Sequence, residues 1–208
     1  RVHGTYHAAT LDILEQSCTG RVLAVELATR RIESVIEGLC FPNGIVTSAD
    51  GGRLFVAETG RYRIWSVATA TRGLDLNRGL PDPATARVIL DNLPGFPDNL
   101  TRGPDGRLWT GLTGPRSTVA DRLASWPRRR RLLMGLPKSL LPLPPAYGHV
   151  FAFDEHGKIF QDLQDPAAAI PATSGATATA DGTLYIQSLE ATAIGRLEQG
   201  AGRPGGPD

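Results

Sequence analysis

Three oxygen-bearing side chains stand at the same position before three similar turns, and their types suit metal chemistry. Asn43, Asp98 and Ser174 each lie seven residues before the aspartate of an Asp-Gly turn. Amide, carboxylate and hydroxyl oxygens are hard donors that suit Ca²⁺ or Mg²⁺. The shared spacing predicts that Asn43, Asp98 and Ser174 converge on one metal site, in which Asp98 is also a candidate general base.

Each of these residues taken alone has a simpler structural interpretation. Asn43 and Asp98 both follow a proline, and Asn or Asp in such a place commonly hydrogen-bonds its own backbone in a turn. The matched spacing is what favours a shared polar site over independent turns.

The turns themselves belong to an internal repeat. The segments 48–56, 103–110 and 179–186 each read as an Asp-Gly turn followed by a strand of alternating apolar residues. The first two turn aspartates are 55 residues apart and the last two are 76 apart, but removing the dissimilar stretch 115–145 leaves 45. A four-stranded propeller blade takes about 40–50 residues.

The repeat therefore predicts an all-β fold, a six-bladed β-propeller of which this chain supplies roughly the C-terminal three and a half blades. Residues 1–199 are expected to form this partial propeller domain, and the Gly- and Pro-rich residues 200–208 a flexible tail. The innermost strand of each blade should precede the Asp-Gly turn and line the central channel. An open ring of this kind predicts an inactive fragment or a self-paired assembly if the chain is the whole protein.

The stretch 115–145 has a different character and predicts a short helical insertion, broken by prolines. Its Arg128 to Arg131 run lies beside apolar residues. One interpretation is a lid over a propeller face with its arginines in water. The other is an element that contacts a membrane surface.

Composition excludes several classes of function. The chain holds 22 Lys and Arg against 21 Asp and Glu, so no overall basic field favours nucleic acid. Cys18 and Cys40 are able to pair, but two cysteines do not make a disulfide framework, and free thiols are the favoured expectation. No apolar run reaches transmembrane length and no signal peptide is visible, and the compartment and oligomeric state stay open.

Other polar residues are expected to be structural. His149 and His156 stand alone at a strand start and in a hairpin turn, and a lone histidine is a weak functional signal. Glu58 ends a strand, where it is expected to pair with Arg61 or Arg63. No Gly-x-Ser-x-Gly elbow supports a serine hydrolase.

Several motifs together resemble the strictosidine synthase-like family. They are Phe41-Pro42-Asn43-Gly44, Val56-Ala57-Glu58-Thr59, Leu93-Pro94-Gly95-Phe96-Pro97-Asp98-Asn99, Tyr147-Gly148-His149-Val150 and Leu184-Tyr185-Ile186-Gln187-Ser188-Leu189. The family includes the adipocyte plasma membrane-associated protein and is related to gluconolactonases and paraoxonases. The resemblance implies a six-bladed propeller, and it implies that Asn43 and Asp98 bind a channel metal, usually Ca²⁺, with other ligands from N-terminal blades.

The resemblance also bears on the reaction. The plant synthase condenses an amine with an aldehyde by means of a late-blade glutamate, but no acidic residue lies between Asp165 and Asp181, and Gly175 or a neighbour takes its place. The leading hypothesis is therefore a Ca²⁺-dependent hydrolase of small-molecule esters or lactones. A non-catalytic propeller that binds a ligand or a protein is the alternative, and the condensation is disfavoured.

Overall fold

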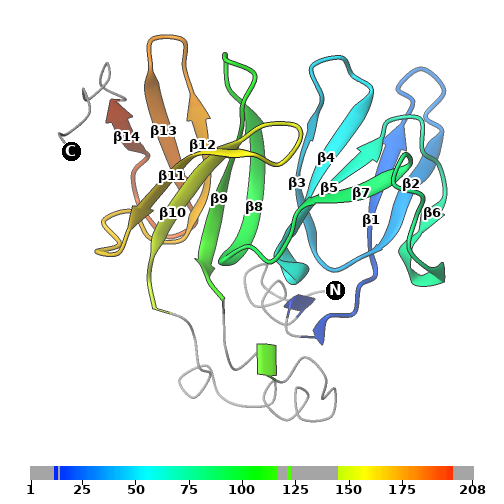
Figure 1. The fold of residues 1–208 in the computed structure, drawn as a ribbon, viewed down its shortest axis with the longest axis horizontal. Helices are drawn as coiled ribbons and strands as arrows, with labels where there is room; N and C mark the ends of the chain where they lie inside the picture. The colour runs from blue at the N-terminus through cyan, green and yellow to red at the C-terminus, as the bar shows by residue number, and fades with distance from the viewer. Residues whose placement is uncertain (1–11, 14, 117–120, 123–144, 199–208) are drawn as a thin grey trace, which may run out of the picture.

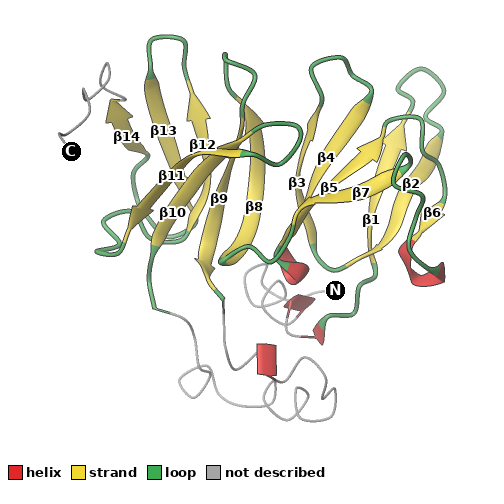
Figure 2. Cartoon of the chain, in the orientation of Figure 1, coloured by secondary structure: helices red, strands yellow, loops and turns green. Residues whose placement is uncertain are grey.

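The computed structural model describes residues 12–13, 15–116, 121–122 and 145–198, and it forms four β-sheets that stand side by side (Figure 1). Nearly all of this part of the chain is strand or loop (Figure 2). The first sheet has the order β1-β2-β6, the second β3-β4-β5-β7, the third β8-β9-β10-β11 and the fourth β12-β13-β14. The strands are β1 (Gly20–Val25), β2 (Ile32–Leu39), β3 (Pro42–Thr47), β4 (Arg53–Glu58), β5 (Arg63–Ala68), β6 (Leu74–Asp75), β7 (Ala86–Leu90), β8 (Gly95–Arg102), β9 (Leu108–Pro115), β10 (Gly148–Phe153), β11 (Ile159–Asp165), β12 (Thr173–Ala178), β13 (Thr183–Ser188) and β14 (Gly195–Glu198).

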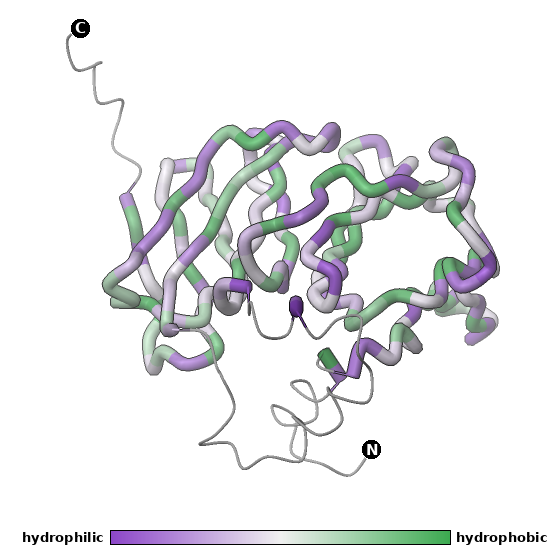
Figure 3. The backbone as a smooth tube through the Cα atoms, turned by 60° about the horizontal axis from the view of Figure 1, so that its bottom comes forward, coloured by the Kyte–Doolittle hydropathy of each residue, from purple (hydrophilic) through white to green (hydrophobic). Residues whose placement is uncertain are grey.

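Two complete four-stranded sheets stand between two three-stranded ones, so the chain is a partial β-propeller, as predicted. Neighbouring strands are antiparallel except that β2 pairs with β6 in parallel. Two short 3-10 helices, η1 (Thr59–Arg61) and η2 (Leu76–Arg78), follow β4 and β6. In the tube view, hydrophobic and hydrophilic residues are interspersed along the strands (Figure 3).

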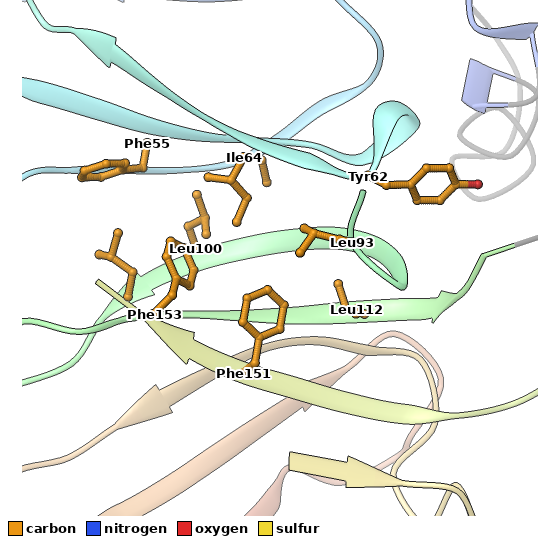
Figure 4. Packing of buried hydrophobic residues seen from close by; sticks show 10 residues of the cluster. Phe55, Tyr62, Ile64, Leu93, Leu100, Leu112, Phe151 and Phe153 are labelled. Atoms are coloured by element: carbon orange, nitrogen blue, oxygen red, sulfur yellow. The ribbon is translucent and has the colours of Figure 1, made fainter. Parts of the chain in front are cut away.

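Each interface between neighbouring sheets has its own hydrophobic cluster. Ile36 and Leu39 of the first sheet pack with Trp65 of the second. Phe55 of the second sheet packs with residues of the third that include Phe153 (Figure 4). A further cluster joins the third and fourth sheets, and its buried members are Trp109, Val150, Ala152, Ala176 and Leu184. The blades are therefore held together face to face, as in a propeller.

The Asp-Gly turns join the first and second strands of three sheets, as predicted. In each turn the glycine has a positive φ, which is 70° at Gly51, 81° at Gly106 and 82° at Gly182. Each turn aspartate accepts a hydrogen bond from the backbone N–H two residues on, and the aspartates are Asp50, Asp105 and Asp181. This arrangement places β3, β8 and β12 as the first strand of their sheets.

These three strands also lie next to one another. A side chain at Gly44 of β3 would collide with the backbone of Asp98 and Leu100 in β8. The Thr101 hydroxyl of β8 donates a hydrogen bond to the Ala176 carbonyl of β12. The strands that carry the predicted site residues are thus consecutive around the centre of the fold.

The cysteines were expected to be free, and this expectation was wrong. Cys18 and Cys40 form a disulfide. The bond ties the segment before β1 to the short connection between β2 and β3. Composition could not reveal it, because the pairing depends on the β1–β2 hairpin bringing residue 40 back beside residue 18.

The disulfide should contribute strongly to stability. It closes a loop between residues 22 positions apart, and for a loop of this length the chain-entropy estimate is about 3 kcal/mol. We expect a Cys18→Ser, Cys40→Ser double variant to lose about this much free energy of unfolding in urea denaturation. Mass spectrometry after thiol alkylation without reductant should find no free cysteine in the wild type, and labelling of both thiols would contradict the assignment.

Some predicted elements fall largely outside the described residues. These are most of the insertion at 115–145, including Arg128 to Arg131, and the tail at 200–208. Among the helices that the structure describes, none has the length and apolar character needed to cross a membrane.

Candidate functional site

The three predicted residues occupy equivalent irregularities of the three inner strands. The pairing of β3 with β4 shifts register between Pro42 and Ile45, where Asn43 lies. The pairing of β8 with β9 shifts between Pro97 and Leu100, where Asp98 lies. A bulge turns a side chain away from the regular pleat and is frequent beside functional sites.

The fourth sheet has the same irregularity. The pairing of β12 with β13 shifts between Thr173 and Gly175, on either side of Ser174. The equivalence that the sequence spacing predicted is therefore present in the strand geometry.

Asn43 and Asp98 are brought together across the two sheets. The Asn43 side chain lies close enough to the Asp98 carboxylate to lower its pKa. The close approach of β3 to β8 at Gly44 makes this contact possible. Asn43 is exposed, whereas Asp98 is only 5% exposed. The pair thus has one buried member and one member open to solvent.

Burial changes the acid strength of Asp98. Removal from water disfavours the ionised carboxylate and raises the pKa of Asp98 to about 6, and the nearby Asn43 side chain offsets part of this effect. A carboxylate with a pKa near 6 is mostly ionised at neutral pH and still accepts protons readily. Such perturbed groups concentrate at functional sites.

Hydrogen bonds from Thr59 connect β8 with the segment before β3, next to Asp98 and Asn43. The Thr59 hydroxyl donates a 2.6 Å hydrogen bond to the Pro97 carbonyl, and the Thr59 N–H donates to the Phe41 carbonyl. Thr59 therefore connects the residue before Asp98 with the segment that leads into Asn43. Sequence reasoning had not assigned Thr59 a role.

Glu58 supports the same region and pairs with Arg63, one of the two predicted partners. Its carboxylate is fully buried and accepts hydrogen bonds from Arg63 Nε and Trp65 Nε1, both at 2.6 Å. Its other oxygen accepts the Cys40 N–H at 2.8 Å. Glu58 is thus a structural residue that fixes the start of β3.

Ser174 lies at the equivalent position of the fourth sheet. It is buried in β12, and its backbone packs against Gly111 of β9. Among the residues that the structure describes, no hydrogen bond joins Ser174 to Asn43 or Asp98.

The Asn43–Asp98 pair fits a hard cation in its chemistry. Asn43 carries an amide oxygen and lies beside the buried Asp98 carboxylate, and both are hard oxygen donors. Ca²⁺ takes six to eight oxygen ligands, and within residues 12–198, where described, no group of three His, Cys, Asp or Glu side chains could hold a metal. Asn43 and Asp98 would therefore be two ligands of a larger set.

The structure gives a physical reason to set the amine–aldehyde condensation aside. A Cβ atom at Gly175 would come within 2.9 Å of the Gln187 side chain and 3.1 Å of Asn99 Cβ. A larger residue at this position would require the Gln187 side chain to move and the backbone near Asn99 to shift slightly. Packing at Gly175 therefore disfavours the proton-transfer carboxylate that the sequence also lacks.

The two described histidines differ in their surroundings. His156 lies in the turn before β11, where its N–H donates to Asp154, in agreement with a structural role. His149 instead joins a polar cluster with Asp162, and the sequence carried no signal of it. Asp162 lies 13 positions after His149 in the sequence, and only the register of β10 and β11 brings these two residues together.

The fold and the site define a class, which is a partial β-propeller with a polar pair on the first strands of two neighbouring sheets. Comparison with known proteins agrees. Residues 3–69 match the family model described as strictosidine synthase. The adipocyte plasma membrane-associated protein of Danio rerio is 30% identical over 192 residues, covering 89% of this chain and 44% of that protein. The predicted resemblance to the strictosidine synthase-like family is thereby confirmed, and the chain spans less than half the length of this relative.

Solved structures show the same fold. A gluconolactonase from Xanthomonas campestris aligns with a TM-score of 0.50 at 19% identity, over 81% of this chain and 41% of that one. A calcium-binding regucalcin from Agrobacterium tumefaciens aligns with a TM-score of 0.50 at 18% identity, over 86% of this chain and 48% of that one. At such identities the likeness concerns the fold alone.

Proposed function

We propose that this chain carries part of the catalytic site of a metal-dependent hydrolase that acts on esters or lactones. The observation that supports the proposal most directly is the Asn43–Asp98 pair, which joins adjacent inner strands and includes a buried carboxylate with a pKa raised to about 6. The two structural neighbours described as a gluconolactonase and as a calcium-binding protein add support for this chemistry on this fold.

In this proposal Asp98 accepts a proton from the attacking water. The water oxygen then bonds to the carbonyl carbon, the carbon–oxygen bond to the leaving group breaks, and the proton passes to the departing alkoxide. The products are a carboxylic acid and an alcohol, which remain one molecule when the substrate is a lactone. A divalent cation held by Asn43, Asp98 and further ligands would polarise the carbonyl.

Metal removal tests the proposal on the full-length protein. We expect hydrolysis of phenyl acetate or γ-butyrolactone in CaCl₂, a loss of at least about tenfold in EDTA, and recovery when Ca²⁺ is restored. Release of phenol or acid is followed spectrophotometrically or by pH-stat. Absence of turnover under both conditions would instead support a non-catalytic propeller, and turnover unaffected by EDTA would remove the metal from the proposal.

A further inference from the structure

A second polar feature lies away from the inner strands, in a surface hollow of about 200 Å³. Its lining residues include Leu112, Gly114 and Pro115 of β9 and His149 of β10, and the end of β9 and the start of β10 lie side by side (Figure 1). Four polar side chains line the hollow. Tyr147 lies just before β10, His149 lies in β10, and Asp162 and Gln164 lie in β11. None of them belongs to the Asn43–Asp98 site.

Hairpin register explains why these side chains meet. His149 pairs with Gln164 and Phe151 pairs with Asp162 across β10 and β11. Residues two apart on a strand point to the same face, so Asp162 and Gln164 lie on one face beside His149. The cluster therefore follows from the regular pleat of the hairpin.

The hydrogen bonds of the cluster run toward Asp162. The Tyr147 hydroxyl donates to Gln164 Oε1 at 2.7 Å, and Gln164 Nε2 donates to Asp162 Oδ2 at 2.8 Å. The His149 ring bonds Asp162 Oδ1 through Nε2 at 2.5 Å. Both carboxylate oxygens are thus held in place by side chains that are themselves oriented.

Asp162 keeps capacity for a further partner. An ionised carboxylate has about four acceptor positions, and His149 and Gln164 occupy two of them. Its side chain is 49% exposed, and no lysine or arginine is among the described residues that line the hollow. The hollow therefore presents an oriented negative charge that favours a ligand with a positively charged N–H donor.

The remaining walls are apolar. The other lining residues are Pro94, Leu112, Gly114 and Pro115. Drug-sized ligands occupy pockets of about 300–1,000 Å³, so this smaller hollow suits a body of roughly ten heavy atoms or fewer. Apolar walls and one carboxylate together define an amphipathic ligand.

We propose that this hollow binds small aliphatic or alicyclic amines, with the ammonium group on Asp162 and the hydrocarbon body against Pro94, Leu112 and Pro115. The inference does not rest on the hydrolase proposal, because it uses none of the residues of the Asn43–Asp98 site. Binding should be weak, with a dissociation constant of about 1 mM, because the ligand is small and Asp162 is half exposed.

The test uses cyclohexylamine as the probe, titrated into the ¹⁵N-labelled chain and followed by amide chemical shifts. We expect saturable shifts at Leu112, Gly114 and Tyr147, and at least fivefold weaker binding of cyclohexanol and cyclohexanecarboxylate. If cyclohexanol bound as tightly as cyclohexylamine, or if the shifted amides lay away from the hollow, the proposal would be wrong. This outcome can be judged on the wild-type chain alone.

Two matched variants locate the charge. Asp162→Asn should weaken cyclohexylamine binding about fivefold, whereas Asp105→Asn, which removes a carboxylate of similar exposure (50%) from a turn, should leave it unchanged. Unchanged binding in Asp162→Asn, or equal weakening in both variants, would contradict the assignment. Asp98→Asn should bind the amine normally, which separates this site from the proposed hydrolase site.

Discussion

Replacement of Asp98 by asparagine should abolish hydrolysis and at the same time stabilise the protein. Asparagine has nearly the same shape but neither accepts a proton from water nor carries the charge that a cation needs. Loss of a general base typically costs 10²–10⁴-fold in rate, so kcat/KM for phenyl acetate should fall by at least about 100-fold. An ordinary structural residue would lose stability on substitution, not gain it.

The expected gain in stability comes from the raised pKa of Asp98. The carboxyl has a pKa of about 6 in the folded state against 3.8 as its ordinary value. At about 1.4 kcal/mol per pKa unit, keeping Asp98 ionised in the fold costs up to about 3 kcal/mol at neutral pH. We expect Asp98→Asn to recover about 1–3 kcal/mol of unfolding free energy in urea at pH 7.5 with EDTA present.

The pH dependence has a definite sign. Because burial favours the protonated acid in the folded state, the stabilising proton is fully bound below about pH 4. It is lost as the pH rises through about 6. As the pH rises from about 4 to about 6, the free energy of unfolding of the wild type should therefore decrease by the contribution of Asp98. The Asp98→Asn variant should not show this decrease. Hydrolysis should show the opposite trend and rise as Asp98 ionises. Because a bound cation stabilises the ionised carboxylate, this rise should come at a lower pH than the loss of stability seen without metal.

A control and a calcium titration complete the experiment. Asp105→Asn changes the turn at the far end of the same strand pair and should preserve activity. Ca²⁺ should raise the unfolding temperature of the wild type more than that of Asp98→Asn, because only the wild type keeps the carboxylate ligand. Retained activity in Asp98→Asn would disprove the general-base role, and an equal calcium effect would disprove ligation by Asp98.

Glu58→Ala should destabilise the protein more than the loss of the disulfide does. Glu58 is fully buried and bonds Arg63, Trp65 and the Cys40 N–H. Removing one member of a buried ion pair leaves the other charge uncompensated and typically costs 3–5 kcal/mol. We expect a loss of about this size in urea denaturation, followed by tryptophan fluorescence.

Glu198→Ala is the matched control for Glu58→Ala. Glu198 also pairs with an arginine, Arg196, but its side chain is 74% exposed. Exposed pairs contribute about 0–1 kcal/mol, so the control should change stability little. If Glu58→Ala were equally mild, Glu58 would not be the structural centre of this region.

The propeller could be predicted because its signals are local and repeated. Each Asp-Gly turn combines a glycine at positive φ with an aspartate that caps the turn, as at Asp50 and Gly51. One strand must then precede the turn and another must follow it. Because the same turn recurs three times, the strand before it can be identified as the first strand of each blade. The equivalence of Asn43 and Asp98 followed from the same counting.

The features that sequence reasoning missed depend on contacts between distant strands. Cys18 meets Cys40 only because β1 and β2 form a hairpin that returns the chain. His149 meets Asp162 only through the register of β10 and β11.

The disulfide has a consequence for where the molecule matures. Cys40 lies just before the strand that carries Asn43, and its N–H is bound by Glu58. Structural disulfides persist in oxidising compartments and are held reduced by glutathione and thioredoxin in most cytosols. Protein made in a reducing cytosol would therefore carry an untethered segment before β1, whereas secreted or periplasmic protein would carry the bridge beside the strand that bears Asn43.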